Sequence, residues 1–337
     1  MLLCRSSCDK KPHIAFILNP RRADNAKTKL NMKTAPKPLA LLLCSLLVAL
    51  LFNSCRDKVT NPPPVSDPPN FLTIDFEPAW SPDGKTIAFC RVDTPPSQIG
   101  LWLINADGTN PRQALKDGFF NSPTWSPDGQ WLAFSVGAQL WKMKRNGDSL
   151  TQLTFQGRNF FPAWSPDGKY IAFDNTICGS ALEPPPPNSC GLLTMRNNGS
   201  EVRLLVRYGR MPTWSPNEHH IAFIGLRSSV FRVKASDSLQ LNQLTWLNPD
   251  EWDNRYPKYS PDGTKILFTS QRLDGSFPQI WVMNADGSNL RQLTTTQGYS
   301  ACWSPDGTRI CYCDSRLSNG RLWIMNSDGS NKRQLTF

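Results

Sequence analysis

From residue 71 onwards, apolar and polar residues alternate in short runs that are separated by clusters of Pro, Asp, Asn and Gly. Typical runs are TIAF at 86–89, YIAF at 170–173 and KILF at 265–268. Alternation over a few residues is typical of half-buried β-strands, and the clusters between the runs supply turns. The pattern therefore predicts an all-β fold with many short strands.

The same unit recurs six times in this part of the chain, with a period of about 45 residues. Each copy contains Trp-Ser-Pro-Asp-Gly or a close variant, and a second aromatic residue follows the first by nine positions. Such a period, with four strands in each unit, is that of a propeller blade. We predict a six-bladed β-propeller of four-stranded antiparallel blades over residues 71–337. The first aromatic residues of the motif, here called the motif aromatics, are Trp80, Trp125, Trp164, Trp214, Tyr259 and Trp303.

Each unit is predicted to contain its four strands in chain order. The first strand ends at the motif aromatic, and Ser-Pro-Asp-Gly then forms a turn, because Pro fixes φ and Gly accepts a positive φ. A second strand, a variable loop, a third strand, an Asp-Gly turn and a fourth strand complete the unit. Because the motif aromatics recur at one place in every copy, we interpret them as packing residues between sheets rather than as a platform for a ligand.

Composition and charge narrow the function classes. Hydrophobic residues make up 39% and charged residues 19% of the chain, which excludes a coiled coil, a helical bundle and general disorder. The net charge is +10, but nine of the 37 Lys and Arg residues lie in residues 1–55. The remaining 28 basic residues are nearly balanced by 25 acidic ones. Since a nucleic-acid binder needs a concentrated basic face, we predict no nucleic-acid partner.

The N-terminal region has the organisation of an export signal. Residues 39–52 form an uncharged apolar run of 14 residues, too short for a membrane-spanning helix but suited to the core of a signal peptide. A basic segment of the right length precedes this run only if the chain starts at Met32. We therefore interpret residues 1–31 as a mis-called start, or alternatively as an extension, and residues 32–55 as the signal peptide.

Cys55 follows Asn53 and Ser54 at the end of the apolar run. This resembles the lipobox of bacterial lipoproteins, which implies that Cys55 is acylated and anchors the chain to a membrane; the alternative is a stray cysteine near a cleavage site. Residues 56–70 are rich in Pro and polar residues and are predicted to form an extended linker. An acidic residue after the lipidated cysteine retains many such proteins at the inner membrane. Arg56 stands at that position here, so the resemblance favours a periplasmic protein anchored to the outer membrane.

The repeat also carries a family resemblance. The strings WSPDGKTIAF at 80–89 and IWVMNADGSNLRQLT at 280–294 resemble the blades of TolB and of the propellers in dipeptidyl and prolyl peptidases. The resemblance implies a six-bladed propeller without the separate α/β domain of TolB, since a Pro-rich spacer fills that position. It also implies a non-enzymatic envelope protein with a protein partner, either a peptidoglycan-associated lipoprotein or another envelope component.

The sequence lacks the residues that the enzymes with related propellers require. A peptidase of the propeller class needs a Gly-x-Ser-x-Gly elbow, and the nearest string, GYSAC at 298–302, lacks the second glycine. Oligogalacturonate lyases use a His-rich manganese site in a related propeller, whereas only His219 and His220 follow Cys55 here. The Asp-Gly turns lack the spacing of a calcium loop. We predict no catalytic residue, no metal and no cofactor.

The remaining cysteines invite two structural expectations. Cys178 and Cys190 bracket an insertion in the third unit, and a disulfide between them would stabilise an exported protein by about 2–4 kcal/mol. Cys302, Cys311 and Cys313 lack a zinc-binding pattern. We interpret these three as small apolar packing residues, or alternatively as containing one cross-strand disulfide.

Aromatic residues outside the motif are the candidate partner-binding residues. They occupy the links between units, where an exposed cluster would suit a protein or a glycan, with buried packing between blades as the alternative. The candidates are Phe119, Phe120, Phe160, Phe161, Trp246 and Trp252. The alternative functions are a glycan-binding or glycan-degrading propeller in polysaccharide uptake, and a scaffold for a separate peptidase.

Two further questions stay open at this level. Residues 71–76 either add an edge strand to the sixth blade or lead into the first blade. In the fourth unit Asn217 and Glu218 replace Asp and Gly of the motif, and the Asp-Gly turn after the third strand is also lost; this reflects either drift or a functional loop.

Overall fold

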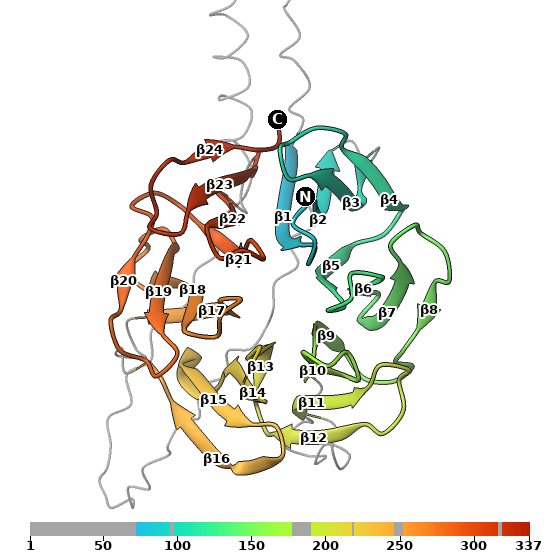
Figure 1. The fold of residues 1–337 in the computed structure, drawn as a ribbon, viewed down its shortest axis with the longest axis vertical. Helices are drawn as coiled ribbons and strands as arrows, with labels where there is room; N and C mark the ends of the chain where they lie inside the picture. The colour runs from blue at the N-terminus through green and yellow to red at the C-terminus, as the bar shows by residue number, and fades with distance from the viewer. Residues whose placement is uncertain (1–71, 95–97, 177–189, 218, 246–251, 316–318) are drawn as a thin grey trace, which may run out of the picture. The chain divides into compact units, whose positions relative to one another are not determined.

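The computed structural model describes residues 72–94, 98–176, 190–217, 219–245, 252–315 and 319–337, which all belong to the compact unit 66–337. These residues form six four-stranded antiparallel sheets arranged as blades around a central axis (Figure 1). Each sheet contains four consecutive strands in chain order, as in β1-β2-β3-β4. The predicted all-β, six-bladed propeller is therefore confirmed.

The strands of the first three blades are β1 (Leu72–Trp80), β2 (Thr86–Thr94), β3 (Gly100–Asn105) and β4 (Arg112–Lys116) in blade 1; β5 (Phe120–Trp125), β6 (Trp131–Val136), β7 (Gln139–Lys144) and β8 (Thr151–Gln152) in blade 2; and β9 (Asn159–Trp164), β10 (Tyr170–Thr176), β11 (Cys190–Arg196) and β12 (Arg203–Val206) in blade 3.

The strands of the other three blades are β13 (Arg210–Trp214), β14 (His220–Ile224), β15 (Val230–Lys234) and β16 (Asp237–Gln243) in blade 4; β17 (Trp252–Tyr259), β18 (Lys265–Arg272), β19 (Gln279–Asn284) and β20 (Arg291–Gln292) in blade 5; and β21 (Tyr299–Trp303), β22 (Arg309–Cys313), β23 (Leu322–Asn326) and β24 (Arg333–Gln334) in blade 6. A short 3₁₀ helix, η2 (Leu226–Ser228), lies between β14 and β15.

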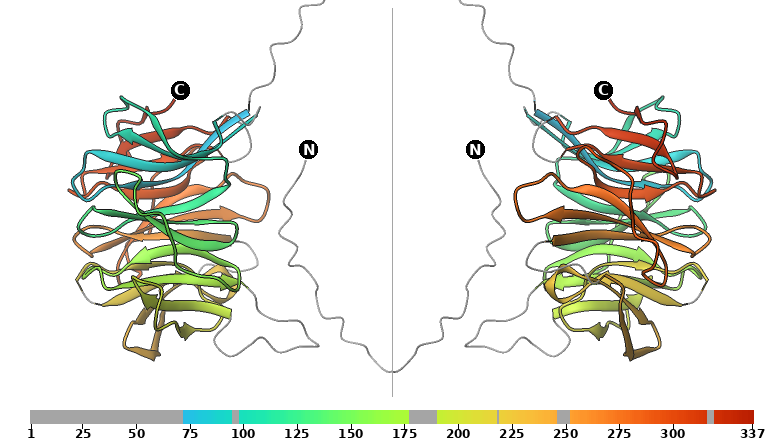
Figure 2. Two further views of the ribbon diagram at one scale, coloured as in Figure 1. Left: turned by 90° about the vertical axis from the view of Figure 1, so that its right-hand side faces the viewer. Right: turned by 90° about the vertical axis from the view of Figure 1, so that its left-hand side faces the viewer.

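The Ser-Pro-Asp-Gly motif forms a turn that its own side chains hold closed. The Ser81 hydroxyl donates to the carboxylate of Asp83 at 2.6 Å and accepts the Thr86 N–H at 2.9 Å. Gly84 has a φ of 71°, which an L side chain would adopt only with strain. These turns and the Asp-Gly turns after the third strands lie on one side of the ring, here called the turn face. The opposite side, here called the loop face, carries the links from one blade to the next (Figure 2).

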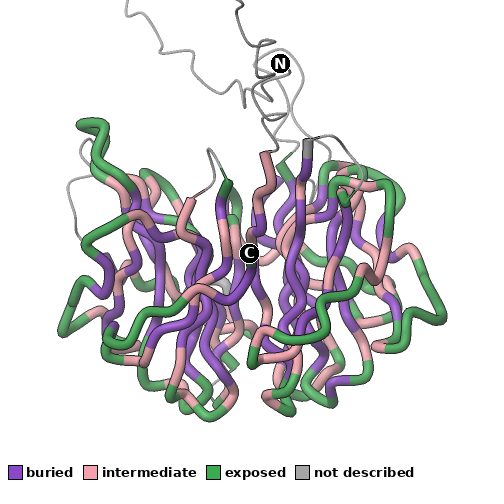
Figure 3. The backbone as a smooth tube through the Cα atoms, turned by 90° about the horizontal axis from the view of Figure 1, so that it is seen from above, coloured by how far each residue is buried: buried purple, intermediate pink, exposed green. Residues whose placement is uncertain are grey.

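The core lies between neighbouring sheets rather than at the centre of the ring. The inner strands of the blades are buried in their middle, whereas outermost strands such as β4 and β20 are half-buried or exposed, and exposed residues gather at the turns on both faces (Figure 3). The second aromatic residue of each unit is almost completely buried, with Phe89 and Phe134 0% exposed. Each motif aromatic packs against the sheet of the preceding blade, and the Trp125 indole N–H donates to the Ala79 carbonyl at 3.1 Å. Each blade is thus joined to its neighbour by an aromatic interface.

The ring closes without an exchanged strand among the described residues, because β1 is the innermost strand of blade 1. The Asp75 N–H donates to the Gly320 carbonyl at 2.9 Å, and the Arg321 guanidinium donates to the Thr73 carbonyl at 2.6 Å. Residues 72–76 therefore lead into the first blade and contact the loop before β23. Within the described residues, no helix has the length and apolar character needed to cross a membrane.

A buried ion pair fixes the strand pair that closes the ring. Asp75 is 0% exposed, and its two carboxylate oxygens accept hydrogen bonds from the Arg91 guanidinium at 2.5 and 2.8 Å. The guanidinium carbon lies 4.7 Å from the centroid of the Trp102 ring. Removing one partner from such a pair leaves the other charge buried and uncompensated.

We predict that Asp75→Ala lowers the free energy of unfolding by about 3–5 kcal/mol, because it leaves the Arg91 charge buried without a counter-charge. Urea unfolding followed by circular dichroism measures the effect. The double variant Asp75→Ala, Arg91→Leu is the control, and it should regain most of the loss because it removes both charges. A single variant as stable as the parent protein would show that the pair does not hold the closure.

Candidate functional site

Every innermost strand carries a β-bulge three residues before its motif aromatic, and the strand register shifts at this point in all six blades. The first residue of each bulge has a positive φ although none is glycine. Such a bulge re-aims a side chain and increases the local twist. The bulge residues are Glu77 (φ 53°), Ser122 (53°), Phe161 (53°), Met211 (54°), Tyr256 (56°) and Ser300 (50°).

The bulge residues make one half of the channel apolar. The rings of Phe161 and Tyr256 meet edge to face, with their centroids 5.8 Å apart. They belong to blades 3 and 5, which blade 4 separates, so their contact crosses the inner opening of the ring. Met211 of blade 4 completes the group, because its sulfur accepts the Tyr256 N–H at 3.5 Å. The other half is polar, and the Glu77 carboxylate accepts the Ser122 N–H at 2.6 Å.

Several bulge N–H groups are satisfied by a side chain of the preceding blade. Besides the Ser122 and Tyr256 examples, the Ser300 N–H donates to the Thr269 hydroxyl at 3.1 Å, and the Met211 N–H donates to the Asp174 carboxylate at 3.2 Å. A buried N–H without a partner is costly, so these bonds tie each bulge to its neighbouring sheet.

Asp174 is the unusual member of this set. It is 1% exposed, and its Oδ1 atom has no hydrogen-bond partner among the described residues. Burial raises the pKa of Asp174 to about 7, although the Met211 N–H and the nearby Arg210 charge oppose the shift. The equivalent residues of the other blades, which follow the second aromatic, carry no such carboxylate: Cys90, Ser135, Ile224, Thr269 and Cys313.

The channel opens on the turn face into a mouth of about 260 Å³. Lys258 is the charged residue among those that line it, and burial lowers the pKa of its ammonium group against the opposing effect of Cys302 and Glu77. The mouth is otherwise formed mainly by prolines and motif aromatics: Pro78, Pro82, Pro123, Pro216, Pro261, Trp80, Trp125, Trp214, Tyr259 and Trp303.

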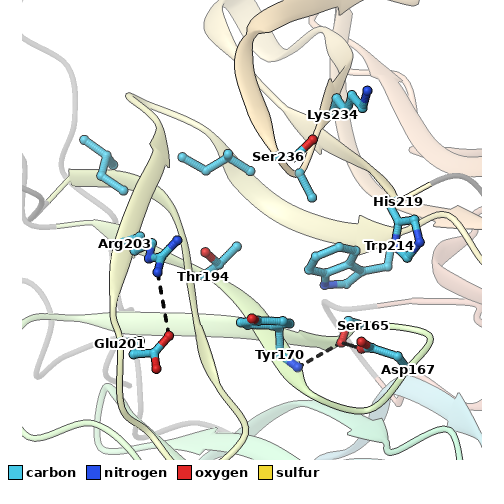
Figure 4. Close-up of a pocket in the computed structure, with 13 residues that line it drawn as sticks. Ser165, Asp167, Tyr170, Thr194, Glu201, Arg203, Trp214, His219, Lys234 and Ser236 are labelled. Carbon is cyan, nitrogen blue, oxygen red and sulfur yellow. Dashed lines mark hydrogen bonds and ion pairs between the residues drawn. The ribbon is translucent and has the colours of Figure 1, made fainter.

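A second and larger cavity, about 600 Å³ in volume, lies on the turn face between blades 3 and 4 (Figure 4). We call it the inter-blade cleft. The rings of Tyr170 and Trp214 lie beside each other at one end of it, and Asp167 and His219 lie next to them. Thr194 of β11 also lines the cleft. Both aromatic rings are partly exposed, whereas the other five motif aromatics are at most 9% exposed.

The aromatic rings of the inter-blade cleft are held by their surroundings. The Trp214 indole N–H donates to the Ala163 carbonyl at 3.0 Å. The Arg196 guanidinium lies 5.6 Å from the Tyr170 ring centroid, and the same group donates to the Glu201 carboxylate at 2.7 Å. Both rings therefore present fixed surfaces rather than mobile ones.

The pKa of Asp167 is lowered by its neighbours. Burial raises its pKa, but the Ser165 hydroxyl, the Lys169 N–H and the charges of Lys169 and His219 outweigh burial, so that the pKa lies below its ordinary value. The cleft thus contains a carboxylate beside two aromatic rings.

The aromatic candidates of the sequence occupy different environments. Phe120 is 7% exposed and packs edge to face on Phe134 at 5.5 Å, so the buried alternative applies to it. Phe119 is 67% exposed. Phe161 lies in the channel, and Phe160 is half-buried on β9.

The last two aromatic candidates lie in and beside blade 5. Trp252 is half-buried, and its ring contacts that of Trp281 at 5.9 Å. Trp246 lies outside the described residues. The described candidates are therefore spread over several blades rather than gathered in one cluster.

The other predicted sites are only partly described. Cys55 and Cys178 lie outside the described residues, whereas Cys190 is buried and takes part in a disulfide. Its pairing with Cys178 stays a prediction. Cys302 and Cys311 face each other on β21 and β22 and are free thiols. Among the described residues, no three His, Cys, Asp or Glu side chains are grouped closely enough to hold a metal ion.

Sequence reasoning missed the roles of Tyr170, Thr194 and Lys258, and it treated Trp214 as one of six equivalent packing residues. The available signal was the loss of the Asp-Gly turn after Trp214, which marked blade 4 as different. The position of the cleft depends on contacts between blades, which the repeat pattern does not encode.

Comparison with protein families matches residues 66–182 and 188–337 to the family described as TolB beta propeller domain. Among curated proteins, the uncharacterized protein Atu1656 of Agrobacterium fabrum is 32% identical over 102 residues, or 29% of this chain. The match spans about a third of that relative's length, 33%.

Solved structures that share the fold include a TolB and a lyase. TolB from Acinetobacter baumannii has a TM-score of 0.61 and 21% identity, over 77% of this chain and 62% of that one. An oligogalacturonate lyase in complex with manganese has a TM-score of 0.54 and 14% identity, over 80% of this chain and 79% of that one. At these identities, the likeness shows the fold alone.

We predict that Asp174→Asn stabilises the protein increasingly as the pH rises from about 4 to about 7. Over this range the folded parent protein retains a proton that the unfolded chain has released, so its stability falls by up to about 1.4 kcal/mol per pH unit. The neutral amide avoids this loss. Urea unfolding at a series of pH values measures it, with the exposed Asp148→Asn as the control. A difference between variant and parent that is equal at pH 5 and pH 8 would contradict the buried-carboxyl assignment.

Proposed function

We propose, since the chain belongs to the TolB β-propeller domain family, that it is a non-enzymatic binding module of the bacterial cell envelope. The propeller would hold a segment of a protein partner, and Cys55 would carry a lipid anchor that keeps the module in the periplasm. The apolar run at 39–52, the residues before Cys55 and the Pro-rich linker at 56–70 support this placement. A peptidoglycan-associated lipoprotein or another envelope protein is the proposed partner.

The channel mouth is the observation that carries this proposal. Accessible prolines (Pro82, Pro216 and Pro261) and the partly exposed Trp214 ring form an apolar rim around Lys258, and the other motif aromatics pack beneath it. Aromatic anchors in rigid surroundings favour protein contacts, because little conformational entropy is lost when a partner binds. A partner segment that offers an apolar side chain and a carboxylate would match both the rim and Lys258.

The fold by itself does not separate binding from catalysis, since a manganese-containing lyase shares it. The lining of the mouth is what favours our proposal over a glycan site. A glycan site typically combines carboxylates with aromatic rings, whereas this mouth combines an apolar rim with one ammonium group. The mouth therefore supports a protein partner over a sugar.

We predict that a photo-crosslinking side chain at Pro216, in the channel mouth, captures one dominant envelope protein in intact cells. The same probe at the exposed Thr151, on the outer strand β8, is the positional control and should capture no such protein. Mass spectrometry identifies the captured chain.

Lys258→Glu should abolish the capture because it reverses the charge of the mouth. Lys85 is exposed on the same face outside the mouth, so Lys85→Glu should leave the capture unchanged. Equal capture from both probe positions would refute a partner at the mouth.

We predict that the mature chain begins at Cys55 with attached acyl groups and fractionates with membranes. Mass spectrometry of the N-terminal peptide tests this in the full-length protein as expressed in its cells. Cys55→Ser should release the propeller into the soluble periplasmic fraction, because the anchor is lost while the fold is untouched. An unmodified chain that starts before Met32 would refute both the anchor and the export signal.

A further inference from the structure

We infer that the inter-blade cleft is a second ligand site, which binds a neutral sugar unit of an oligosaccharide. The inference is independent of the protein partner proposed above, because the cleft and the channel mouth contain largely different residues. It rests on why the cleft is open, on the surfaces that it presents and on the charges at its rim.

The cleft is open because blade 3 lacks a long side chain that its neighbours have. In blade 2, the Lys142 ammonium donates to the Asn197 carbonyl in the turn of blade 3 at 2.7 Å. In blade 4, the Arg232 guanidinium reaches the Ala285 carbonyl in the turn of blade 5 at 3.5 Å. Thr194 occupies the equivalent position on β11 of blade 3, and its side chain is too short to bridge to blade 4.

The same crease also lacks the long turn side chain that covers the crease between blades 1 and 2. In blade 2, Arg145 of the Asp-Gly turn donates to the Asp83 carboxylate at 2.6 Å and covers the Trp125 ring at 5.5 Å. Ala235 is its counterpart in blade 4, because both backbone N–H groups bond to the residue that precedes their second strand. Ala106 and Ala285 stand at the same position in blades 1 and 5, so Arg145 is the exception among these turns. Asp167 and Trp214, the counterparts of Asp83 and Trp125, have no such side chain over them, and Trp214 is the one motif aromatic of the described blades that is partly exposed.

The uncovered surfaces suit a sugar ring. Tyr170 and Trp214 offer fixed, partly exposed aromatic faces, on which the C–H face of a pyranose can stack. Leu204 and Leu205 add apolar surface from β12. A volume of about 600 Å³ lies within the usual range for a small-molecule site and admits one or two sugar units.

The rim favours a neutral ligand. It combines the carboxylates of Asp167 and Glu201 with the cations of Arg203 and Lys234. Hydroxyl groups both donate and accept hydrogen bonds, so a sugar can use groups of either sign, whereas a charged ligand would meet a like charge. The Ser236 side chain adds a hydroxyl to the same rim.

The test uses the full chain and four neutral trisaccharides: maltotriose, cellotriose, tri-N-acetylchitotriose and α-1,4-galactotriose. Saturation-transfer NMR and isothermal titration calorimetry measure binding. We expect at least one of them to bind with a dissociation constant of about 1 mM or below. Two charged trisaccharides are compared with their neutral counterparts. The acidic trigalacturonate should bind more weakly than galactotriose, and the basic chitosan triose should bind more weakly than the acetylated chitotriose.

Ala235→Arg is the blocking variant, because its guanidinium can reach Asp167 as Arg145 reaches Asp83. It should weaken binding by about tenfold or more while leaving the thermal unfolding temperature unchanged. Ser327→Arg is the matched control. It makes the equivalent change in the crease between blades 5 and 6, where Asp262 corresponds to Asp167, and it should leave binding unaffected. Thr194→Lys, which copies Lys142, is a second blocking variant with the same expected loss.

Three results would overturn the inference. The first is the absence of binding by all four neutral trisaccharides at about 10 mM. The second is an equal loss of binding in Ala235→Arg and Ser327→Arg, which would place the sugar elsewhere. The third is tighter binding of a charged trisaccharide or of a peptide than of any neutral sugar. Lys258→Glu should not change sugar binding, so a failed partner capture at the mouth and a failed sugar site give different results.

Discussion

The contact between each motif aromatic and the preceding sheet is the interaction on which this propeller depends. A four-stranded sheet has two apolar faces, and in this ring each face is covered by the neighbouring blade, so no blade can bury its core alone. The Trp125 and Trp303 indoles also donate to backbone carbonyls of the preceding innermost strand, which fixes the angle between blades. The bulges add hydrogen bonds at the channel. Stability is therefore a property of the interfaces between blades.

The sequence predicts the blades well because their determinants are local. In Ser-Pro-Asp-Gly, the Ser81 hydroxyl, the Asp83 carboxylate and Gly84 all act within one turn, so the motif alone identifies the strands around it. Ring closure depends instead on Arg321 and Thr73, which are 248 positions apart in the chain and carry no repeat signal. For that reason the role of residues 72–76 could be posed as a question from the sequence but answered only by the fold.

The candidate sites were harder to predict, for the same reason. Phe120 and Phe161 both lie near the beginning of an innermost strand, yet one is buried against Phe134 and the other reaches across the channel to Tyr256. Hydropathy does not separate them. Their spacing from the motif aromatic differs, five residues for Phe120 and three for Phe161, but that spacing has a meaning only once the bulge at the third position is known. The inter-blade cleft depends on Thr194 and Ala235, which are far apart in the sequence and meet in one crease. Such a pair is found by comparing the six interfaces between blades with one another, because a comparison of single strands does not show which residues meet.

The departures from the repeat are not spread evenly around the ring. Asp174 belongs to blade 3, Asn217 and Glu218 to the motif of blade 4, and Lys258 to blade 5, in the half of the ring where the channel is apolar. The opposite half contains the closure, with its buried ion pair between Asp75 and Arg91. The interface between blades 1 and 6 closes the ring, and no strand is exchanged across it. Looser packing there would therefore weaken the closure directly. Blades 3 to 5 are continuous in the chain and are free of this constraint, so a cleft or an unpaired charge costs the ring least there.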